Sequence, residues 1–501
     1  LHIDGHTDGM NFWFNTNVEE VKVSDSLKLN DVSFDGFTNR DTSSVLVNFA
    51  GEDTTKSMAS FYINSAFLYT GYTAIKLMPR KLLLDGQSWT IDENNYVLAD
   101  TTGLLLNEFN FINGIQELAF DGIIGKDSSA KLNIGFKDFE AAQVNDFLSI
   151  YNVNVGGLTN GSAEISGVFG KPALNADLNV LNIQWYGDTL GSADLKTVWD
   201  SKLDQVNVSA QVTRGGVKNI NVEGTYYMLD KGDRLDFTAY LQKTYIKSFA
   251  HYLDGLVSDV TGIASGEVHL RGSSEKPELT GKIILQKVGF TIDYLQTSYN
   301  FSTEVDILKD RFQFKNVLLN DVKGNQAIAN GFIRHNYLDN FYFDIDINAT
   351  RTQVLNTGPA DNDLYYGVAY ASGNVSIKGY LDYINMIIGL RSEKGTKINI
   401  PLSNPEEVSR SGFITFINTG APVIEEEDVP DFSGIDLSMI FDITPDATIS
   451  LVFDEKIGDV IEGNGEGSIK MTISPSEDLK MYGDFTIESG KYLFTMQNVI
   501  N

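Results

Sequence analysis

Apolar and polar side chains alternate along most of this chain with a period of two residues. In residues 161–180 the apolar positions of this pattern are Ala163, Ile165, Leu174, Ala176, Leu178 and Val180. The same alternation runs through residues 130–139, 340–349, 436–444 and 446–454. Successive side chains of a β-strand point to opposite faces, so each segment predicts a strand with one apolar and one polar face. Glycines and short clusters of Asn, Asp and Ser separate the segments, as turns require, and the whole pattern predicts an all-β protein.

Two stretches, at about residues 140–152 and 244–257, depart from this period and predict short amphipathic helices. Their apolar residues are spaced i, i+3, i+4 and i+7, which places them on one face of a helix. These residues are Val144, Phe147, Leu148 and Tyr151 in the first stretch, and Phe249, Tyr252, Leu253 and Leu256 in the second. Each position of the second set lies 105 residues after its counterpart, as Phe249 does after Val144.

The same offset continues beyond the helices and indicates an internal repeat. It relates Gly161 to Gly266 and Lys171-Pro172 to Lys276-Pro277, and further glycine-bounded strands follow at 373–379 and 467–475. The repeating unit is therefore one helix followed by several strands, stacked lengthwise. The predicted segments are 1–95 (β-groove), 96–200 (repeat 1), 201–305 (repeat 2), 306–395 (repeat 3), 396–434 (a proline-rich, acidic excursion) and 435–501 (a C-terminal β segment).

The composition of the chain excludes several classes of function. The formal net charge is −29, from 67 Asp and Glu against 38 Lys and Arg, which argues against nucleic-acid binding and against lying on an anionic membrane. No cysteine is present, so thiol catalysis and disulfides are excluded. The chain begins with Leu1 and has no apolar run of the ~20 residues that span a bilayer. We expect it to be part of a longer protein whose membrane anchor, if any, lies elsewhere.

Two groups of polar residues could carry chemistry. His2, Asp4, His6 and Asp8 share a face if residues 2–8 form a strand, and imidazole with carboxylate suits zinc. Asp344 and Asp346 form a second pair. A polar strand face explains both groups more simply. Because no nucleotide-binding loop, nucleophile elbow or metalloprotease motif is present either, we expect no enzyme activity, no cofactor and no metal site.

The apolar strand faces then need an explanation. They could form the closed core of ordinary β-sandwiches, including a stack of such domains in an extracellular adhesin. Two observations favour an open sheet: the repeat is long, and predicted helices occur too rarely to cover it. A sheet curled around its own apolar face would leave a trough along its length. The predicted fold is therefore a long, twisted, repetitive β-groove with an apolar interior and a few short amphipathic helices.

Several stretches resemble the C-terminal domain of TamB proteins of Gram-negative bacteria. The clearest is "FDEKIGDVIEGNGEGSIKMTISPSEDLKMYGDFTIESGKYLFTMQNVI", at residues 453–500. Others are "LNDVKGNQAIANGFIRHNYLDNFYFDIDI" at 319–347 and "DNDLYYGVAYASGNVSIKG" at 361–379. A further one, at 88–122, is "SWTIDENNYVLADTTGLLLNEFNFINGIQELAFDG". The resemblance implies an AsmA-like, bridge-like lipid transfer protein that is anchored in the inner membrane and crosses the periplasm to the outer membrane. It also implies a partner, which is TamA or another outer-membrane barrel of the Omp85 class.

Under this hypothesis the groove shields phospholipid acyl chains between the two membranes. The residues expected to line it are Leu174, Leu178, Val180, Ile283, Leu285, Phe343, Ile345, Ile347, Ile449, Leu451, Ile469 and Met471. The alternative is an assembly factor or chaperone for outer-membrane β-barrel proteins, because an open groove also has free strand edges that can pair with a client strand.

Overall fold

A computed structural model describes residues 2–22, 28–51, 57–68, 71–84, 86–125, 127, 129–145, 153–168, 173–229, 232–253, 255–362, 364–380, 382–402, 434–454, 459–474 and 477–493. Nearly all of these residues lie in strands, which confirms the all-β class. The chain divides into two compact units. The N-terminal unit comprises Leu1–Thr244 with His269–Ser274, and the C-terminal unit comprises Tyr245–Val268 with Glu275–Asn501. This division does not test the finer segments predicted from the repeat.

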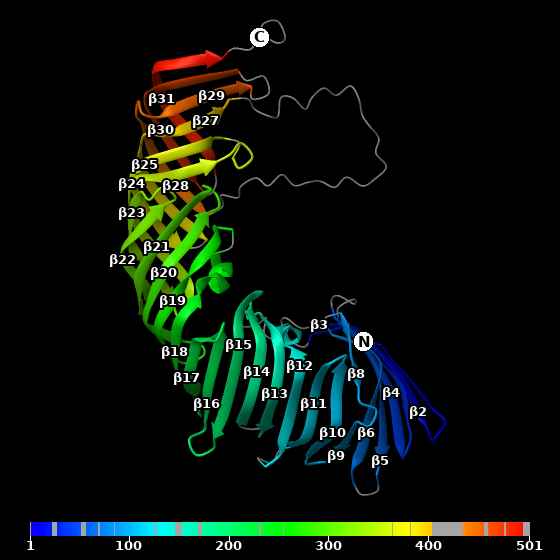
Figure 1. Ribbon diagram of the computed structural model, residues 1–501. Coiled ribbons are helices and arrows are strands. Elements are labelled where there is room, and N and C mark those ends of the chain that lie inside the picture. Colours follow the sequence, from blue (N-terminus) through cyan, green and yellow to red (C-terminus); the bar gives the residue numbers. More distant parts are fainter. Residues whose placement is uncertain are drawn as a thin grey trace, which may run out of the picture. The chain divides into compact units, whose positions relative to one another are not determined.

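The N-terminal unit is an antiparallel sheet whose strands follow one another in chain order (Figure 1). They are β1 (His2–Thr7), β2 (Phe12–Lys22), β3 (Lys28–Thr38), β4 (Thr42–Ala50), β5 (Met58–Phe67), β6 (Thr73–Leu84), β7 (Gln87–Ser88), β8 (Thr90–Ile91), β9 (Tyr96–Ala99), β10 (Gly103–Asn113), β11 (Gln116–Gly125), β12 (Lys131–Glu140), β13 (Val155–Ser166), β14 (Ala173–Trp185), β15 (Asp188–Asp200), β16 (Gln205–Arg214), β17 (Val217–Leu229) and β18 (Gly232–Tyr245). The short strands β7–β9 bridge β6 and β10.

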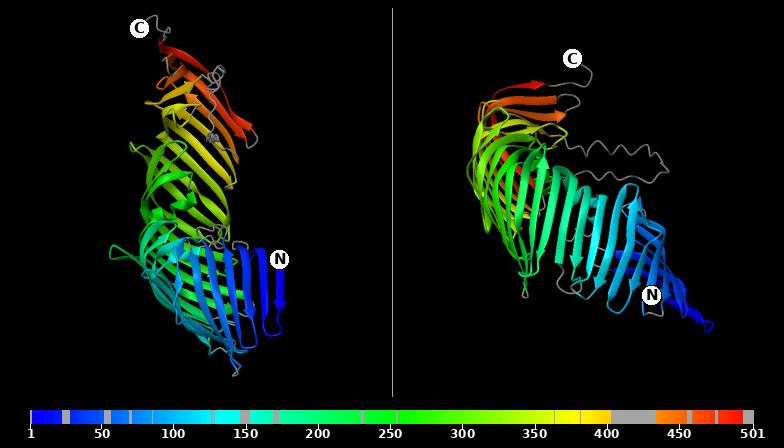
Figure 2. Two further views of the ribbon diagram at one scale, coloured as in Figure 1. Left: turned by 90° about the vertical axis from the view of Figure 1, so that its right-hand side faces the viewer. Right: turned by 60° about the horizontal axis from the view of Figure 1, so that its bottom comes forward.

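The C-terminal unit contains most of β19 and all later strands (Figure 2). They are β19 (Val257–Gly272), β20 (Pro277–Ile292), β21 (Thr297–Leu308), β22 (Arg311–Asp321), β23 (Gln326–Asn336), β24 (Asp339–Thr357), β25 (Tyr366–Tyr380), β26 (Tyr383–Ser392), β27 (Lys397–Pro401), β28 (Ile435–Ile443), β29 (Thr448–Asp454), β30 (Asp459–Ser474) and β31 (Glu477–Leu493). Of the predicted excursion at 396–434, residues 397–401 form β27, and residues 403–433 lie outside the described residues.

Antiparallel order is interrupted between β25 and β30. One part of β25 pairs with β26 and another part with β27. Strand β28 then runs parallel to β26, and β29 runs parallel to β27. Both β28 and β29 pair with β30, so two branches of the sheet separate at β25 and rejoin at β30.

β-bulges bend the strands, and each of four bulges has the same construction. The bulge residue has a left-handed φ of 45–53°, the pairing register shifts there, and its N–H donates to a side chain of the next strand. These bonds join Asp138 to Asn160 Oδ1 (2.9 Å), Lys287 to Ser302 Oγ (3.0 Å), Asn316 to Asn330 Oδ1 (2.7 Å) and Arg351 to Ser372 Oγ (2.9 Å). An extra residue on one strand increases the local twist, so repeated bulges curl a sheet around one face.

Glycines bend the sheet as well, and they follow the sequence repeat. Gly161 on β13 and Gly266 on β19 have φ of +125° and +154°. A Cβ atom at Gly161 would collide with the carbonyl oxygen of Asp177, and one at Gly266 with that of Lys282. The 105-residue offset therefore relates two backbone bends that only glycine tolerates.

Helices occur near both predicted places, but as 3₁₀ helices. They are η1 (Ala141–Val144) and η3 (Ile246–Leu253), whose starts are also 105 residues apart. Residues 146–152 of the first predicted helix lie outside the described residues. With 3.0 residues per turn, a 3₁₀ helix does not keep the spacing i, i+3, i+4 and i+7 on one face. Accordingly, Phe249, Leu253 and Leu256 are exposed instead of forming a buried stripe.

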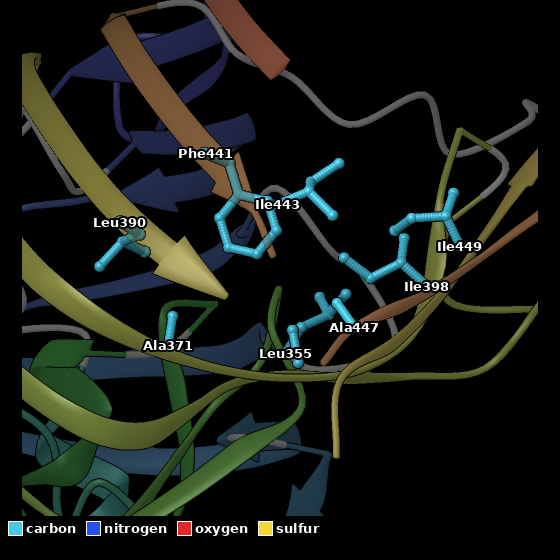
Figure 3. Close-up of a cluster of buried hydrophobic side chains, with 9 residues drawn as sticks. Leu355, Ala371, Leu390, Ile398, Phe441, Ile443, Ala447 and Ile449 are labelled. Carbon is cyan, nitrogen blue, oxygen red and sulfur yellow. The ribbon is translucent and has the colours of Figure 1, made fainter. Parts of the chain in front are cut away.

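The main buried core lies in the C-terminal unit between the two branches of the sheet. Its members come from β24–β29 and the turn before β29, and Figure 3 shows their side chains converging on one space. They are Leu355, Ala369, Ala371, Leu390, Ile398, Phe441, Ile443, Ala447 and Ile449.

A line of polar residues crosses the same unit where the strands are interrupted. We call it the crease and define it as Ser372, Ser392, Thr396, Thr444 and Asn464. Its hydrogen bonds run from Ser372 Oγ to Glu393 Oε1 (2.7 Å), from Thr444 N–H to Ser392 Oγ (2.8 Å), from Thr396 Oγ1 to Tyr370 O (2.9 Å) and from Asn464 Nδ2 to Ala447 O (2.8 Å). These bonds satisfy backbone and side-chain groups that the interrupted ladders leave unpaired.

Candidate functional site: an apolar cavity in the C-terminal unit

An apolar cavity of about 470 Å³ lies in the C-terminal unit. Its wall takes side chains from β20–β28, β30 and β31, with Leu390 and Ile398 from opposite sides of the crease. None of the lining residues carries a charge. The volume is within the ~300–1,000 Å³ typical of small-molecule sites.

Three lining residues carry a hydroxyl group, and two of these groups are bound to the backbone. Tyr299 Oη donates to Gln353 O at 2.6 Å, and Thr352 Oγ1 donates to Gln326 O at 3.0 Å. The third is Tyr365, whose Oη lies 3.4 Å from Tyr294 Oη. Burial is the main cause that raises the pKa of Tyr299 and of Tyr365, so both hydroxyls are neutral.

Five of the predicted lining residues lie at the cavity or its core. Ile347, Ile469 and Met471 line the cavity itself. Ile449 is 3% exposed and belongs to the buried core, and Leu451 packs against that core.

Four more predicted residues continue the same apolar face. On β24, Ile345 lies opposite Ile377, which lines the cavity, and Phe343 lies opposite Gly379. On β20, Ile283 and Leu285 are half-buried, and the bulge at Lys287 then shifts the apolar face from odd to even positions. Beyond this bulge Phe290 and Ile292 line the cavity.

The last three predicted residues lie in the N-terminal unit, on β14. Leu178 and Val180 are half-buried and lie opposite Gly161 and Thr159 of β13, whereas Leu174 is 37% exposed. Ala163 and Ala176, on the same face, are buried. These residues form a continuous apolar face, and their contact with lipid stays a prediction.

The prediction missed other lining residues on segments whose alternation it had recognised. Examples are Val375 and Ile377 in the strand at 373–379, and Met439 and Phe441 in the strand at 436–444. It also missed Ile388, whose neighbour Ile387 is 59% exposed. The run "MIIGL" has no polar alternation to show which isoleucine faces inward.

The polar candidates have structural partners instead. Asp344 forms an ion pair with Lys378 at 3.2 Å on the outer face of the sheet. The carboxylate of Asp8 accepts hydrogen bonds from the backbone of its own turn, which lowers its pKa. Within the described ranges, no group of three or more His, Asp and Glu side chains is arranged to hold a metal ion.

A curled β-sheet that encloses a cavity lined by uncharged side chains defines a β-groove protein with an apolar cavity. Residues 315–500 match the family model of the TamB C-terminal domain. The match lies within the C-terminal unit and includes most of the cavity lining. No curated protein and no solved structure matches the chain.

TamB proteins belong to the envelope of Gram-negative bacteria. Among the described residues, no helix has both the length and the apolar character that crossing a membrane requires. The resemblance noted at residues 88–122 lies outside the matched region and stays a prediction.

Proposed function

We propose that this chain is a periplasmic segment of a bridge-like lipid transfer protein, and that its apolar faces shield phospholipid acyl chains between the inner and outer membranes. The observation that carries the proposal is the cavity of about 470 Å³, whose wall is uncharged and mostly aliphatic. An inner-membrane anchor outside this piece, and an outer-membrane barrel of the Omp85 class as partner, belong to the same proposal. The role is binding, without catalysis.

The energetics favour an acyl chain as the occupant. Moving a sixteen-carbon chain into water costs about 13 kcal/mol, at ~0.8 kcal/mol per CH₂. An uncharged wall removes most of this cost. With about 30 Å³ for a group the size of a water molecule, the cavity has room for on the order of fifteen such groups. That is the size of one acyl chain, so the headgroup would remain outside in water.

Neighbouring residues on β26 provide a matched test. Ile388 lines the cavity, whereas Ile387 is 59% exposed on the opposite face of the same strand. A photo-crosslinking amino acid would be placed at each position in the full-length protein in cells, and adducts identified by mass spectrometry. We expect phospholipid adducts at position 388 and few at position 387. Equal adducts at both positions, or none at 388, would contradict the proposal.

The alternative, assembly of outer-membrane β-barrels, is favoured by a different observation. Among the described residues the pairing of β31 is with β30, and a client strand could pair with its other edge. Tyr482 and Ile487 on β31 are 59% and 43% exposed. Crosslinkers at these two positions would capture barrel precursors if the alternative holds.

A further inference from the structure

We infer that the cavity takes an ester-linked acyl chain, and that the hydroxyls of Tyr365 and Tyr294 bind the ester carbonyl where the chain leaves the cavity. This inference rests on the proposed function and adds the chemical class of the ligand. Tyr365 lines the cavity, and Tyr294 is 40% exposed, so the pair connects the apolar interior with solvent.

Two turns hold this pair in place. Tyr294 belongs to the turn between β20 and β21, and Tyr365 to the connection between β24 and β25. Asn356 joins them, because its N–H donates to Leu295 O at 2.9 Å and its Nδ2 donates to Gln296 O at 3.2 Å. Asn362 Nδ2 also donates to Tyr294 Oη, at 3.3 Å. These hydrogen bonds fix the two turns, and with them the hydroxyl groups of Tyr294 and Tyr365, at the rim of the cavity.

The hydroxyl of Tyr365 has bonding capacity to spare. The side chain of Asn362 hydrogen-bonds to its oxygen, and its other partner is Tyr294 Oη at 3.4 Å, which is long for a hydrogen bond between hydroxyls. The other two lining hydroxyls, of Tyr299 and Thr352, already donate to backbone carbonyls. A ligand entering the cavity thus meets one available donor in an otherwise apolar wall. Such a donor fixes the position of a carbonyl oxygen.

The charge around this rim favours an ester over a free carboxylate. The same two turns carry the carboxylates of Asp293 and Asp361, and among the described residues no Lys or Arg is hydrogen-bonded to Asn356, Asn362 or Tyr365. A fatty-acid carboxylate would be partly desolvated here without a cation, which is costly. An ester carbonyl needs only a neutral donor. The phosphate of a phospholipid would then lie farther out, in water.

Binding to the purified chain tests this assignment. An uncharged fluorophore, N-phenyl-1-naphthylamine, would be displaced at neutral pH by methyl laurate or by laurate, which share one chain length. We expect the ester to bind more tightly than the anion. Y365F should weaken the ester on the order of fivefold, the loss of about one hydrogen bond, and leave the fluorophore's own affinity unchanged.

Y299F is the matched control, because it removes a lining hydroxyl that is already bound to Gln353 O. It should leave the preference for the ester intact. Equal affinity of laurate and methyl laurate, or equal effects of Y365F and Y299F, would overturn the assignment while leaving acyl-chain binding in place. Failure of the fluorophore to bind the unaltered chain, or undiminished binding in Ile388→Lys, would count against the proposed function itself.

Discussion

The two units of this protein use the same alternating strands but bury them to different degrees. In the N-terminal unit, a buried cluster of Val97, Leu106 and Leu132 lies on a sheet in which nearly every strand pairs with its successor. The C-terminal unit has a nine-residue core beside a cavity, and its sheet branches. An alternating pattern therefore supplies an apolar face, and the enclosure of that face depends on the branching.

The crease explains how the enclosure is built. A sheet that curls only by bulges and glycine bends keeps a wide opening, because the curvature is spread over many strands. Where β26 ends and β27 begins, the chain turns within four residues, and the same occurs between β28 and β29. Apolar residues from both sides of these turns then belong to one buried core, as Leu390 and Ile398 do.

The largest expected effect comes from the C-terminal core. Phe441→Ala should destabilise the C-terminal unit by about 3–5 kcal/mol, because Phe441 is 6% exposed and its loss leaves a cavity. Trp13, Trp89, Trp185 and Trp199 are the four tryptophans of the chain, and all lie in the N-terminal unit. Urea unfolding followed by tryptophan fluorescence should therefore change little, while hydrogen exchange in β25 and β28 should accelerate.

Leu132→Ala is the counterpart in the N-terminal unit, where Leu132 is 7% exposed. It should move the fluorescence transition, by about 2–5 kcal/mol, and leave exchange in β28 unchanged. If either substitution shifts both readouts equally, the two units unfold as one, and the comparison between them fails.

The crease should give the next largest effect. Ser392 is 2% exposed and accepts the N–H of Thr444 at 2.8 Å, so Ser392→Ala leaves this partly buried N–H group without its partner. We expect a loss of about 1–3 kcal/mol in the C-terminal unit, measured by hydrogen exchange. Ser450→Ala is the control, because Ser450 is 1% exposed and its hydroxyl has no hydrogen-bond partner among the described residues. That substitution should be neutral or stabilising, and a loss as large as that of Ser392→Ala would contradict the role of the crease.

The sequence predicts features that depend on neighbouring residues, and it does not predict features that depend on residues far apart in the chain. Alternation within one strand is local, and it placed Ile347, Ile469 and Met471 on the face that lines the cavity. The crease and the parallel pairing of β26 with β28 depend on partners about fifty residues apart, which no local pattern specifies. A bulge such as that at Lys287 also reverses the facing of later residues, and it is defined only by the register with the next strand.

Lowering the pH should also reduce the stability of the C-terminal unit, by less than the substitutions in its core and crease. His335 is 5% exposed and packs against the rings of Phe312 and Phe341, and burial lowers its pKa despite the nearby Asp310. Because the unfolded chain takes up a proton more readily, stability is complete above the ordinary histidine pKa of about 6.5 and falls as the pH drops toward the lowered value.

His335→Phe should remove this pH dependence, because a phenyl ring keeps the aromatic packing and has no proton to gain. Urea unfolding of both proteins, read by hydrogen exchange in β23, should show the two stability curves diverging as the pH falls, because only the wild-type protein loses stability. Parallel curves across that range would rule out His335 as the source.

The smallest expected effect lies on the outer face of the same sheet. Lys378 and Asp344 form an ion pair at 3.2 Å, with 45% and 28% of their side chains exposed, and hydrogen bonding to Asp344 is the main cause that raises the pKa of Lys378. Exposed ion pairs add little to stability because water and salt screen them. Lys378→Met should therefore change the free energy of unfolding only slightly, and the change should shrink as salt is added.

The contrasting substitution is on the opposite face of the same strand, where Asp344 has the inward-facing Ile345 as its neighbour, and it is Ile345→Asp. It places an unpaired carboxylate on the apolar face, and it should destabilise the unit and lower lipid capture far more than Lys378→Met. Similar losses from the two substitutions would mean that the inner face is as exposed to solvent as the outer face. The proposed lipid site depends on a difference between the two faces, and that difference would then not exist.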